Sequence, residues 1–343
     1  MRKTLFAFGV FVSSATFADT AKVAAYVVDS SNGEPISSAV VRANFAQKVG
    51  GWAWVESPHP DVDKQMSGLD GHCSLKGETN CGRVSCWVTK APVGYYAGGG
   101  WGHTYTNKDF FGVWQPDNLV ATIRLDRVEH PIPLWVKGVC VSKAHRQAPV
   151  FNGTNAVWRY DLMMGDWLPP LGNGEEADLV IKIAYRIIEE VQGVSSRFDC
   201  YECIQTVTFP GVGNGEIASI AGSARGIRLR QAPETGFVPS FETRFGTGKK
   251  VRKYYCARDE YDDSNPKRCH AFRIRSKYDD RGNLVEAYYG KIYGDFNFKE
   301  VWHGVSSPLF RYYLNRTSLD RNLEWDMKTN LCPEPGSLSQ PQP

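Results

Sequence analysis

Two aspartates near the middle of the chain, Asp161 and Asp166, are the candidates that the sequence offers for catalysis. A pair of carboxyl groups can hydrolyse a glycosidic bond, and such a pair has no fixed spacing along the chain. Aspartates in turns also accept hydrogen bonds from nearby backbone amides. Two interpretations of Asp161 and Asp166 therefore stay open: the carboxylates of a hydrolase, or turn residues with a structural role.

Other catalytic signatures are missing from the sequence. It contains no His-Glu-x-x-His zinc helix, no Gly-x-Ser-x-Gly nucleophile elbow and no Gly-x-x-x-x-Gly-Lys phosphate loop. The acidic run 259–263 could bind calcium, but it lacks the ordered spacing and the glycine of an EF-hand loop. We interpret it as a solvated hairpin tip, and we predict neither a metal site nor a cofactor.

Aromatic residues are dense between positions 95 and 114, around the flexible Gly98-Gly99-Gly100. Exposed aromatic rings suit sugars, whose C–H groups stack on the π-face of a ring. The same rings could instead fill a core or a contact between domains, because β-domains commonly bury aromatic side chains. If a ligand binds in this segment, we expect its contacts to be Tyr95, Tyr96, Trp101 and Trp114.

The sequence holds nine cysteines, which predict disulfides in an oxidising compartment. Cys256 and Cys269 enclose a polar loop between two β-like runs, and we predict a disulfide between them. Closing a loop of that size stabilises a fold by about 3 kcal/mol in the chain-entropy model. Cys200 and Cys203 lie three apart in a predicted strand, which separates their Cα atoms by about 10 Å and prevents a mutual bond unless the chain turns. A four-cysteine zinc site and a redox-active Cys-x-x-Cys pair are the alternatives.

The first 18 residues have the order of a secretory signal peptide. Arg2 and Lys3 give a positive start, and an apolar run follows at 5–12. Ala15-Thr16-Phe17-Ala18 then has small side chains at the positions that a signal peptidase reads, with an expected cut before Asp19. No later run approaches the roughly 18 apolar residues that a membrane helix needs. We therefore expect an exported protein, periplasmic or extracellular, without a transmembrane segment.

The charge balance argues against nucleic acid as a partner. The chain has 40 basic and 37 acidic residues, and removing Arg2 and Lys3 leaves 38 against 37, a net charge of +1. Binding to a nucleic-acid backbone is favoured by a strong basic excess. The densest basic stretch, 249–253, enters a β-like run, and we interpret its charges as protection of an exposed strand.

Alternating apolar residues predict a mostly β chain. Strands are expected at 23–28, 39–45, 83–89 and 119–128, with Asn-Gly and Asp-Gly turn signals between strands. Short strands at this spacing are typical of a β-sandwich of about 100 residues. The first domain is therefore predicted to be a β-sandwich over 19–128.

A second β-rich domain of unassigned fold is expected over 129–332. It begins near Glu129–Pro133, where two prolines stiffen the chain. Residues 178–188 predict a strand rather than a helix, because alternating β-branched residues dominate them, and 198–209 is the expected partner strand. The tail, 333–343, is rich in Pro, Ser and Gln and is expected to be disordered.

Residues 20–128 resemble a carboxypeptidase regulatory-like domain, which is a transthyretin-like β-sandwich. The matching segments are Val27-Val28-Asp29, Asn32-Gly33-Glu34-Pro35-Ile36, Ala39-Val40-Val41, Leu69-Asp70-Gly71 and Ala91-Pro92-Val93-Gly94-Tyr95-Tyr96. The resemblance implies a fold and no activity, because such modules are attached to many unrelated proteins. A zinc carboxypeptidase would need a His-x-x-Glu pair, and this sequence has none.

The whole chain resembles an uncharacterised family of exported bacterial proteins. The matching segments include Pro131-Ile132-Pro133-Leu134, Tyr160-Asp161-Leu162, Gly165-Asp166-Trp167, Tyr288-Tyr289-Gly290-Lys291-Ile292-Tyr293, Tyr312-Tyr313-Leu314-Asn315 and Asp320-Arg321-Asn322-Leu323-Glu324. This resemblance implies no known activity.

Two functional hypotheses follow. The first is a non-enzymatic binding or structural protein whose β-domains present loops to a glycan or to a cell-surface protein. The second is a periplasmic or secreted hydrolase that uses carboxylates of the second domain. A carboxylate pair in a deep cleft favours the hydrolase, and an exposed aromatic shelf favours binding.

Overall fold

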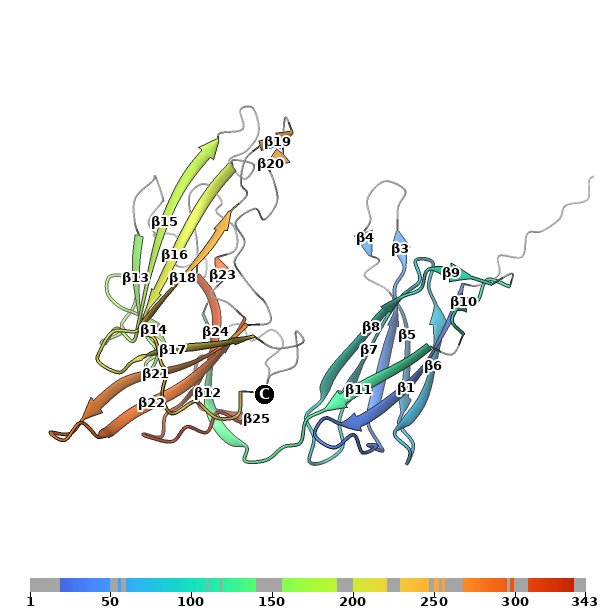
Figure 1. The fold of residues 1–343 in the computed structure, drawn as a ribbon, viewed down its shortest axis with the longest axis horizontal. Coiled ribbons are helices and arrows are strands. Elements are labelled where there is room, and N and C mark those ends of the chain that lie inside the picture. Colours follow the sequence, from blue (N-terminus) through green and yellow to red (C-terminus); the bar gives the residue numbers. More distant parts are fainter. Residues whose placement is uncertain are drawn as a thin grey trace, which may run out of the picture. The chain divides into compact units, whose positions relative to one another are not determined.

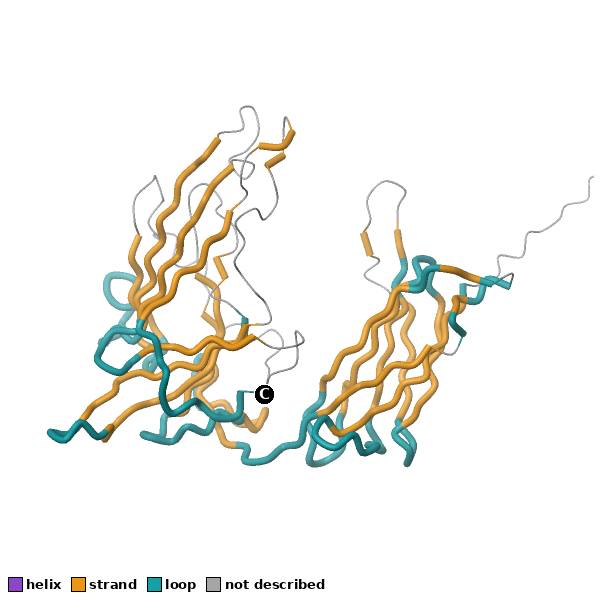
Figure 2. The backbone as a smooth tube through the Cα atoms, viewed as in Figure 1, coloured by secondary structure: helices purple, strands orange, loops and turns teal. Residues whose placement is uncertain are grey.

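A computed structural model gives the structure of residues 19–49, 55–56, 60–109, 111–117, 119–139, 156–189, 200–220, 229–246, 250–252, 255–256, 268–294, 297–298 and 308–335. These residues form β-strands joined by turns and loops (Figure 1, Figure 2), so the predicted mostly β character is confirmed. The chain divides into two compact units, Met1–Val128 and Glu129–Pro343, here called unit 1 and unit 2. The predicted signal peptide and positions 336–343 of the predicted tail lie outside the described residues.

Unit 1 is a β-sandwich. One sheet has the strand order β11-β1-β6 and the other has the order β5-β2-β7-β8 (Figure 1). The strands are β1 (Thr20–Asp29), β2 (Val40–Phe45), β5 (Asp61–Met66), β6 (His72–Glu78), β7 (Arg83–Lys90), β8 (Gly98–Thr104) and β11 (Leu119–Leu125). Two short pairs complete it, β3 (Lys48–Val49) with β4 (Val55–Glu56), and β9 (Asn107–Lys108) with β10 (Trp114–Gln115).

The core of unit 1 lies between its two sheets, because alternate residues of each strand point inward. In β1, Ala21, Val23, Ala25 and Val27 are buried, and the residues between them are more exposed. They share one core with apolar side chains of the facing strands β2 and β7. The alternation predicted this sandwich correctly.

Carboxylates of β5 cover the open edge of β6. Asp63 Oδ2 accepts a hydrogen bond from the Lys76 N–H at 2.9 Å, and Asp61 Oδ2 accepts one from the Glu78 N–H at 2.7 Å. Since β6 is the last strand of its sheet, no neighbouring strand in that sheet bonds these two donors. The aspartates therefore occupy N–H groups that could otherwise pair with another chain.

Strand β1 ends in a fully buried aspartate. Asp29 Oδ1 accepts hydrogen bonds from the Ser31 N–H (2.8 Å) and hydroxyl (2.5 Å), and Oδ2 accepts from the Tyr95 hydroxyl (2.9 Å) and from Arg127 Nε. The Ser31 hydroxyl has the largest effect on the pKa of Asp29 and lowers it. Burial acts in the opposite direction, but Arg127 and Tyr95 lower the pKa further, so that it lies below the ordinary value of 3.8.

Unit 2 is also built of two sheets (Figure 1). One has the order β14-β13-β15-β16-β18, and the other has the order β17-β21-β22-β24-β12-β25, with β23 paired to β24. The strands are β12 (Ile132–Val139), β13 (Ala156–Asp161), β14 (Asp166–Trp167), β15 (Leu179–Glu189), β16 (Cys200–Thr208), β17 (Gly215–Ile220), β18 (Ser240–Gly246), β21 (Arg268–Tyr278), β22 (Leu284–Tyr293), β23 (Asn297–Phe298), β24 (Pro308–Asn315) and β25 (Trp325–Asn330). A short pair, β19 (Lys250–Arg252) and β20 (Tyr255–Cys256), stands apart from them.

The main core of unit 2 lies between these sheets. Trp158 and Tyr160 come from the five-stranded sheet, and Phe272 and Tyr312 come from the other. The Tyr160 ring meets the Tyr312 ring edge-on, with the ring centroids 6.1 Å apart. Strand β15 pairs antiparallel with β16, as expected for residues 178–188 and 198–209.

In both units the first strand pairs in parallel with the last. Strand β1 pairs with β11 from Val23↔Leu119 to Asp29↔Leu125. Strand β12 pairs with β25 at Ile132↔Trp325 and Leu134↔Asn330. Each unit is therefore closed by a contact between segments far apart in the sequence. Within the described part of the chain, no helix has the length and hydropathy to cross a membrane.

Candidate functional site

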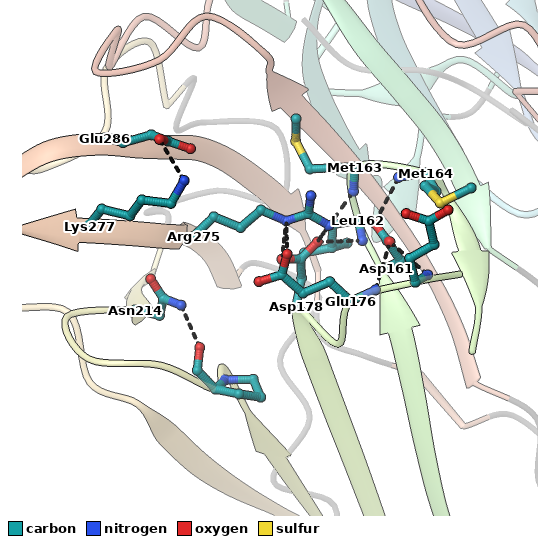
Figure 3. Close-up of polar contacts among 12 residues, drawn as sticks. Asp161, Leu162, Met163, Met164, Glu176, Asp178, Asn214, Arg275, Lys277 and Glu286 are labelled. Carbon is teal, nitrogen blue, oxygen red and sulfur yellow. Dashed lines mark hydrogen bonds and ion pairs between the residues drawn. The ribbon is translucent and has the colours of Figure 1, made fainter. Parts of the chain in front are cut away.

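The candidate site begins with an irregularity in β21. The register between β21 and β22 shifts between Ile274 and Lys277, which marks a β-bulge. Inside the bulge, Arg275 has a φ angle of +51°, in the left-handed region that non-glycine residues seldom adopt. Because a bulge breaks the alternation of a strand, it re-aims a side chain. Here the Arg275 side chain points toward two buried carboxylates (Figure 3).

Asp161 and Asp178 hold the Arg275 guanidinium (Figure 3). Arg275 Nε donates to Asp178 Oδ1 at 2.9 Å, and Nη2 donates to Asp178 Oδ2 at 3.1 Å and to Asp161 Oδ1 at 2.8 Å. Asp161 is the last residue of β13, and Asp178 directly precedes β15. The bidentate pair with Asp178 has the geometry of a strong, charge-assisted contact.

Both carboxylates also accept backbone N–H groups. Asp178 Oδ2 receives the Leu162 N–H at 2.9 Å. Asp161 receives the N–H groups of Met164 at 2.8 Å, Glu175 at 3.1 Å and Glu176 at 3.1 Å. With the Arg275 contact, Asp161 accepts four hydrogen bonds, about the capacity of a carboxylate. Asp161 therefore has no free lone pair with which to take a proton from a substrate or attack one.

Burial and charge act against each other in this cluster. Burial raises the pKa of Asp178, although the hydrogen bond and the charge of Arg275 lower it. Burial also opposes the charge of Arg275, but the hydrogen bond to Asp178 and the charges of Asp178 and Asp161 raise its pKa above the ordinary value. Arg275 therefore remains a cation, and its charge is held by two anions.

A pocket of about 470 Å³ opens beside the bulge. Its lining residues are Met163, Glu176, Ala177, Pro210, Gly211, Asn214, Arg275, Ser276, Lys277, Glu286 and Tyr288. At its wall, Lys277 Nζ and Glu286 Oε2 form an ion pair of 2.8 Å (Figure 3). The pocket therefore combines charged groups of both signs with one aromatic ring.

Asn214 supports the bulge from the neighbouring loop. Its Oδ1 accepts the Ser276 N–H at 2.9 Å, and its Nδ2 donates to the Pro210 carbonyl (Figure 3). The Ser276 hydroxyl oxygen is buried and has no hydrogen-bond partner. Since buried hydroxyls are normally bonded, this oxygen is an unsatisfied polar atom closed off from solvent next to the bulge.

Asp166, the second predicted catalytic residue, belongs to a local turn. Asp161 and Asp166 lie opposite each other in the β13–β14 hairpin. Asp166 Oδ1 accepts the Trp167 N–H at 2.8 Å, and Oδ2 accepts the Asn173 N–H at 2.9 Å. Asp166 thus has the turn role that the sequence left open, and it does not line the pocket.

Two of the predicted ligand-binding rings are buried in unit 1. Trp114 is 8% exposed, and its Nε1–H donates to the Thr79 carbonyl at 2.8 Å. Tyr96 is 6% exposed. Neither ring offers an open face for stacking on a sugar.

The other two predicted rings lie partly exposed. The Tyr95 hydroxyl is bonded to Asp29, which ties its ring to the end of β1. The Trp101 ring packs against the core of unit 1 and stacks on His103, with the ring centroids 5.9 Å apart. A sugar contact of Tyr95 or Trp101 stays a prediction.

The predicted Cys256–Cys269 disulfide stays a prediction, because the side chain of Cys256 lies outside the described part of the structure. Cys269 is buried on β21, and burial raises its pKa to about 12. Cys200 and Cys203 share the extended strand β16, as expected.

Four other cysteines, Cys73, Cys81, Cys86 and Cys332, are free thiols. They do not follow the expectation that cysteines of an exported chain pair with one another. Burial raises the pKa of Cys73 to about 11 and that of Cys86 to about 12, so both thiols stay protonated near neutral pH.

The sequence did not point to Asp178, Arg275 or Ser276. Asp178 and Arg275 are 97 positions apart, and only the sheet packing brings them together. The bulge carries no glycine that could have marked it. Among the described residues, no group of three or more His, Cys, Asp or Glu side chains is arranged to hold a metal ion.

Comparisons with known proteins give only distant matches. No protein-family model matches the chain, and no curated protein matches it either. Among solved structures, a minor pilin of Streptococcus agalactiae matches 34% of this chain and 48% of its own length, with 17% identity and a TM-score of 0.23. The chain thus spans about half the length of that pilin.

Two major pilins match more of the chain. The one from Corynebacterium diphtheriae covers 89% of this chain and 84% of its own length, with 9% identity and a TM-score of 0.25. The one from Bacillus cereus covers 84% and 95%, with 9% identity and a TM-score of 0.21. The chain has a distant structural resemblance to these pilin subunits, and TM-scores this low carry no function across.

Proposed function

We propose that the chain is an exported, non-enzymatic binding protein of the cell surface or periplasm, in which the pocket of unit 2 holds part of a glycan or of a surface protein. Unit 1 serves in this proposal as an accessory β-sandwich. Its resemblance to carboxypeptidase regulatory-like domains fits that role, because such modules accompany many different partner domains.

The observation that carries the proposal is the clamp around Arg275 on the pocket wall. A left-handed non-glycine residue and two buried carboxylates are both unfavourable unless the surroundings hold them. Here eight hydrogen bonds among the described residues hold Arg275, Asp161 and Asp178 in place. Rigid polar groups beside a pocket favour specific binding, because little ordering remains to be done when the ligand arrives.

Hydrolysis has less support from the same geometry. A glycosidase needs one carboxyl group that can give up a proton and a second that attacks or activates water. The hydrogen-bond capacity of Asp161 is filled, and Asp166 is bonded within its turn. Two carboxylates line the pocket wall, those of Glu176 and Glu286, and Glu286 is paired with Lys277.

The proposal is tested by a glycan array and a surface-protein binding screen on the mature chain. Ala177 lines the pocket, so Ala177→Trp should fill it and abolish binding of any ligand found. Ala184→Trp on the exposed side of β15 is the matched control and should bind as the wild type does. Both variants must melt within a few degrees of the wild type.

Two results would overturn the proposal. One is a ligand that binds Ala177→Trp as well as the wild type, because the pocket would then be irrelevant. The other is release of a sugar or peptide product from the bound ligand, which would make the chain a hydrolase.

A further inference from the structure

The charges around the pocket do not cancel. Four carboxylates stand in or directly behind its wall, those of Asp161, Asp178, Glu176 and Glu286. Two cations face them, Arg275 and Lys277. Four negative charges against two positive charges leave a net charge of −2 when every group is ionised. A cation is therefore favoured in this pocket over an anion.

Both cations are already neutralised by neighbours. Arg275 makes three hydrogen bonds to Asp161 and Asp178, so this group of three carries a net negative charge. Lys277 is paired with Glu286 at 2.8 Å. An anionic ligand would have to compete with these carboxylates, which makes a phosphate or carboxylate a poor occupant.

Glu176 carries the uncompensated charge at the pocket. Its Oε2 lies 3.5 Å from Arg275 Nε, and that nitrogen already donates to Asp178 at 2.9 Å. The Glu176 side chain is 64% exposed and lines the pocket, so its carboxylate is accessible to a ligand.

An aromatic ring accompanies this carboxylate in the pocket lining. Tyr288 adds an aromatic ring, which attracts an organic cation over its face. An ammonium group has three N–H donors and no acceptor, and it matches a carboxylate beside an aromatic ring.

We propose that the pocket recognises a primary ammonium group on its ligand, with Glu176 as the charge partner and the Tyr288 ring as a second contact. Two sources offer this group, the lysine side chain of a surface protein and the amino group of a non-acetylated amino sugar. This inference rests on the proposed binding function and adds the chemistry that selects the ligand.

The test uses two matched pairs of probes on the full mature chain, followed by NMR titration. The first pair is Nα-acetyl-lysine amide and its Nε-acetylated form, and the second is glucosamine and N-acetylglucosamine. Acetylation removes the positive charge and leaves most of the molecule unchanged. The charged member of at least one pair should bind at the pocket, and its neutral partner should bind at least about fivefold more weakly.

Variants connect the effect to Glu176. Glu176→Gln should weaken binding of the charged probe about fivefold or more and leave the neutral probe unaffected. Glu242→Gln, at an exposed position on β18, is the matched control and should bind as the wild type does. Raising the salt concentration from about 20 mM to about 300 mM should also weaken binding of the charged probe, because it shortens the Debye length.

The outcomes separate this inference from the proposed function. If the acetylated probes bind at the pocket as tightly as the charged ones, the pocket is a binding site and the ammonium inference is wrong. Binding of the charged probes that Glu176→Gln leaves intact also overturns the inference. If Ala177→Trp leaves all ligand binding unchanged, the proposed function itself fails.

Discussion

Arg275 links the two sheets of unit 2 through its ion pairs with Asp161 and Asp178. Its guanidinium is bonded to Asp161 at the end of β13 and to Asp178 before β15, while its backbone lies in β21 of the other sheet. Removing the cation would leave two buried carboxylates without a counter-charge. An uncompensated buried charge destabilises a fold far more than the loss of an exposed pair does.

We expect Arg275→Met to destabilise unit 2 by about 3–5 kcal/mol at pH 7. The measurement is urea unfolding, with hydrogen exchange of unit 2 peptides as the local readout. Arg159→Met on the exposed side of β13 is the matched control, and it should change stability by less than about 0.5 kcal/mol. A loss of less than about 1 kcal/mol in Arg275→Met would show that the clamp is not needed for the fold.

Asp29 in unit 1 allows a prediction about pH. Its folded-state pKa lies below the ordinary value of 3.8, so its charged form stabilises the fold above that value. This contribution is lost as the pH falls through the lower, folded-state pKa. Asp29→Asn should therefore be less stable than the wild type by about 2 kcal/mol at pH 7, and the difference should shrink below about pH 4.

Hydrogen exchange of β1 peptides at a series of pH values measures this difference. Asp70→Asn, at an exposed turn position of the same unit, is the control and should show a much smaller difference. A difference that grows on acidification would contradict the assignment of Asp29 as the stabilising charge.

Sequence patterns could identify part of the site and not the rest. Asp161 was a candidate because of its residue type, and its turn role was one of the two interpretations. No residue type in Phe272–Tyr278 predicts a bulge, because the segment contains no glycine. Strict alternation along the strand would instead point the Arg275 side chain away from Asp161 and Asp178. The clamp depends on tertiary packing, which local patterns do not contain.

At the scale of elements, alternation was a good guide because each sheet buries one face. The segments expected as strands at 23–28, 119–128 and 178–188 are β1, β11 and β15. Strand partners were harder to predict, because pairing such as β1 with β11 joins residues about a hundred positions apart. The strands β9 and β10 have two residues each, which is too short to show an alternation of apolar and polar residues.

The covered edge of β6 gives a prediction about association. A double variant, Asp61→Ala with Asp63→Ala, frees the Lys76 and Glu78 N–H groups. Free edge donors pair with strands of other molecules, so we expect dimers or larger species on size-exclusion chromatography with light scattering. Lys64→Ala on the same strand is the control and should remain like the wild type. A double variant that runs as the wild type does would show that the aspartates are not needed to protect this edge.

For the whole molecule, cysteine chemistry is the most direct test of the export expectation. Peptides containing Cys256 and Cys269 should be joined in a non-reducing digest of exported protein. Cys73 and Cys86 should react with an alkylating reagent only after unfolding, since burial raises the pKa of both thiols. Cys256 or Cys269 found free, or joined elsewhere, would refute the predicted bridge.

The amino terminus of exported protein is the second test at this scale, and we expect it at Asp19. A cut there keeps residues that the fold uses. Asp19 Oδ2 lies 2.7 Å from Lys108 Nζ, and the Asp19 carbonyl accepts the Thr79 N–H at 2.9 Å. Mass spectrometry of the intact protein measures the terminus, and a retained Met1 on exported, folded material would contradict the signal peptide.

The parallel pairing of first and last strands has a mechanical consequence. When unit 1 is stretched by its ends, the Thr20 end of β1 and the Leu125 end of β11 are pulled in opposite directions along the strands. All seven residue pairs from Val23↔Leu119 to Asp29↔Leu125 then carry the force together in shear, and none can open first as in a zipper. Strands β12 and β25 place unit 2 under the same loading. The seven-pair contact thus suits unit 1 to resist tension along the chain, whereas in unit 2 two residue pairs separated by a register shift take the load.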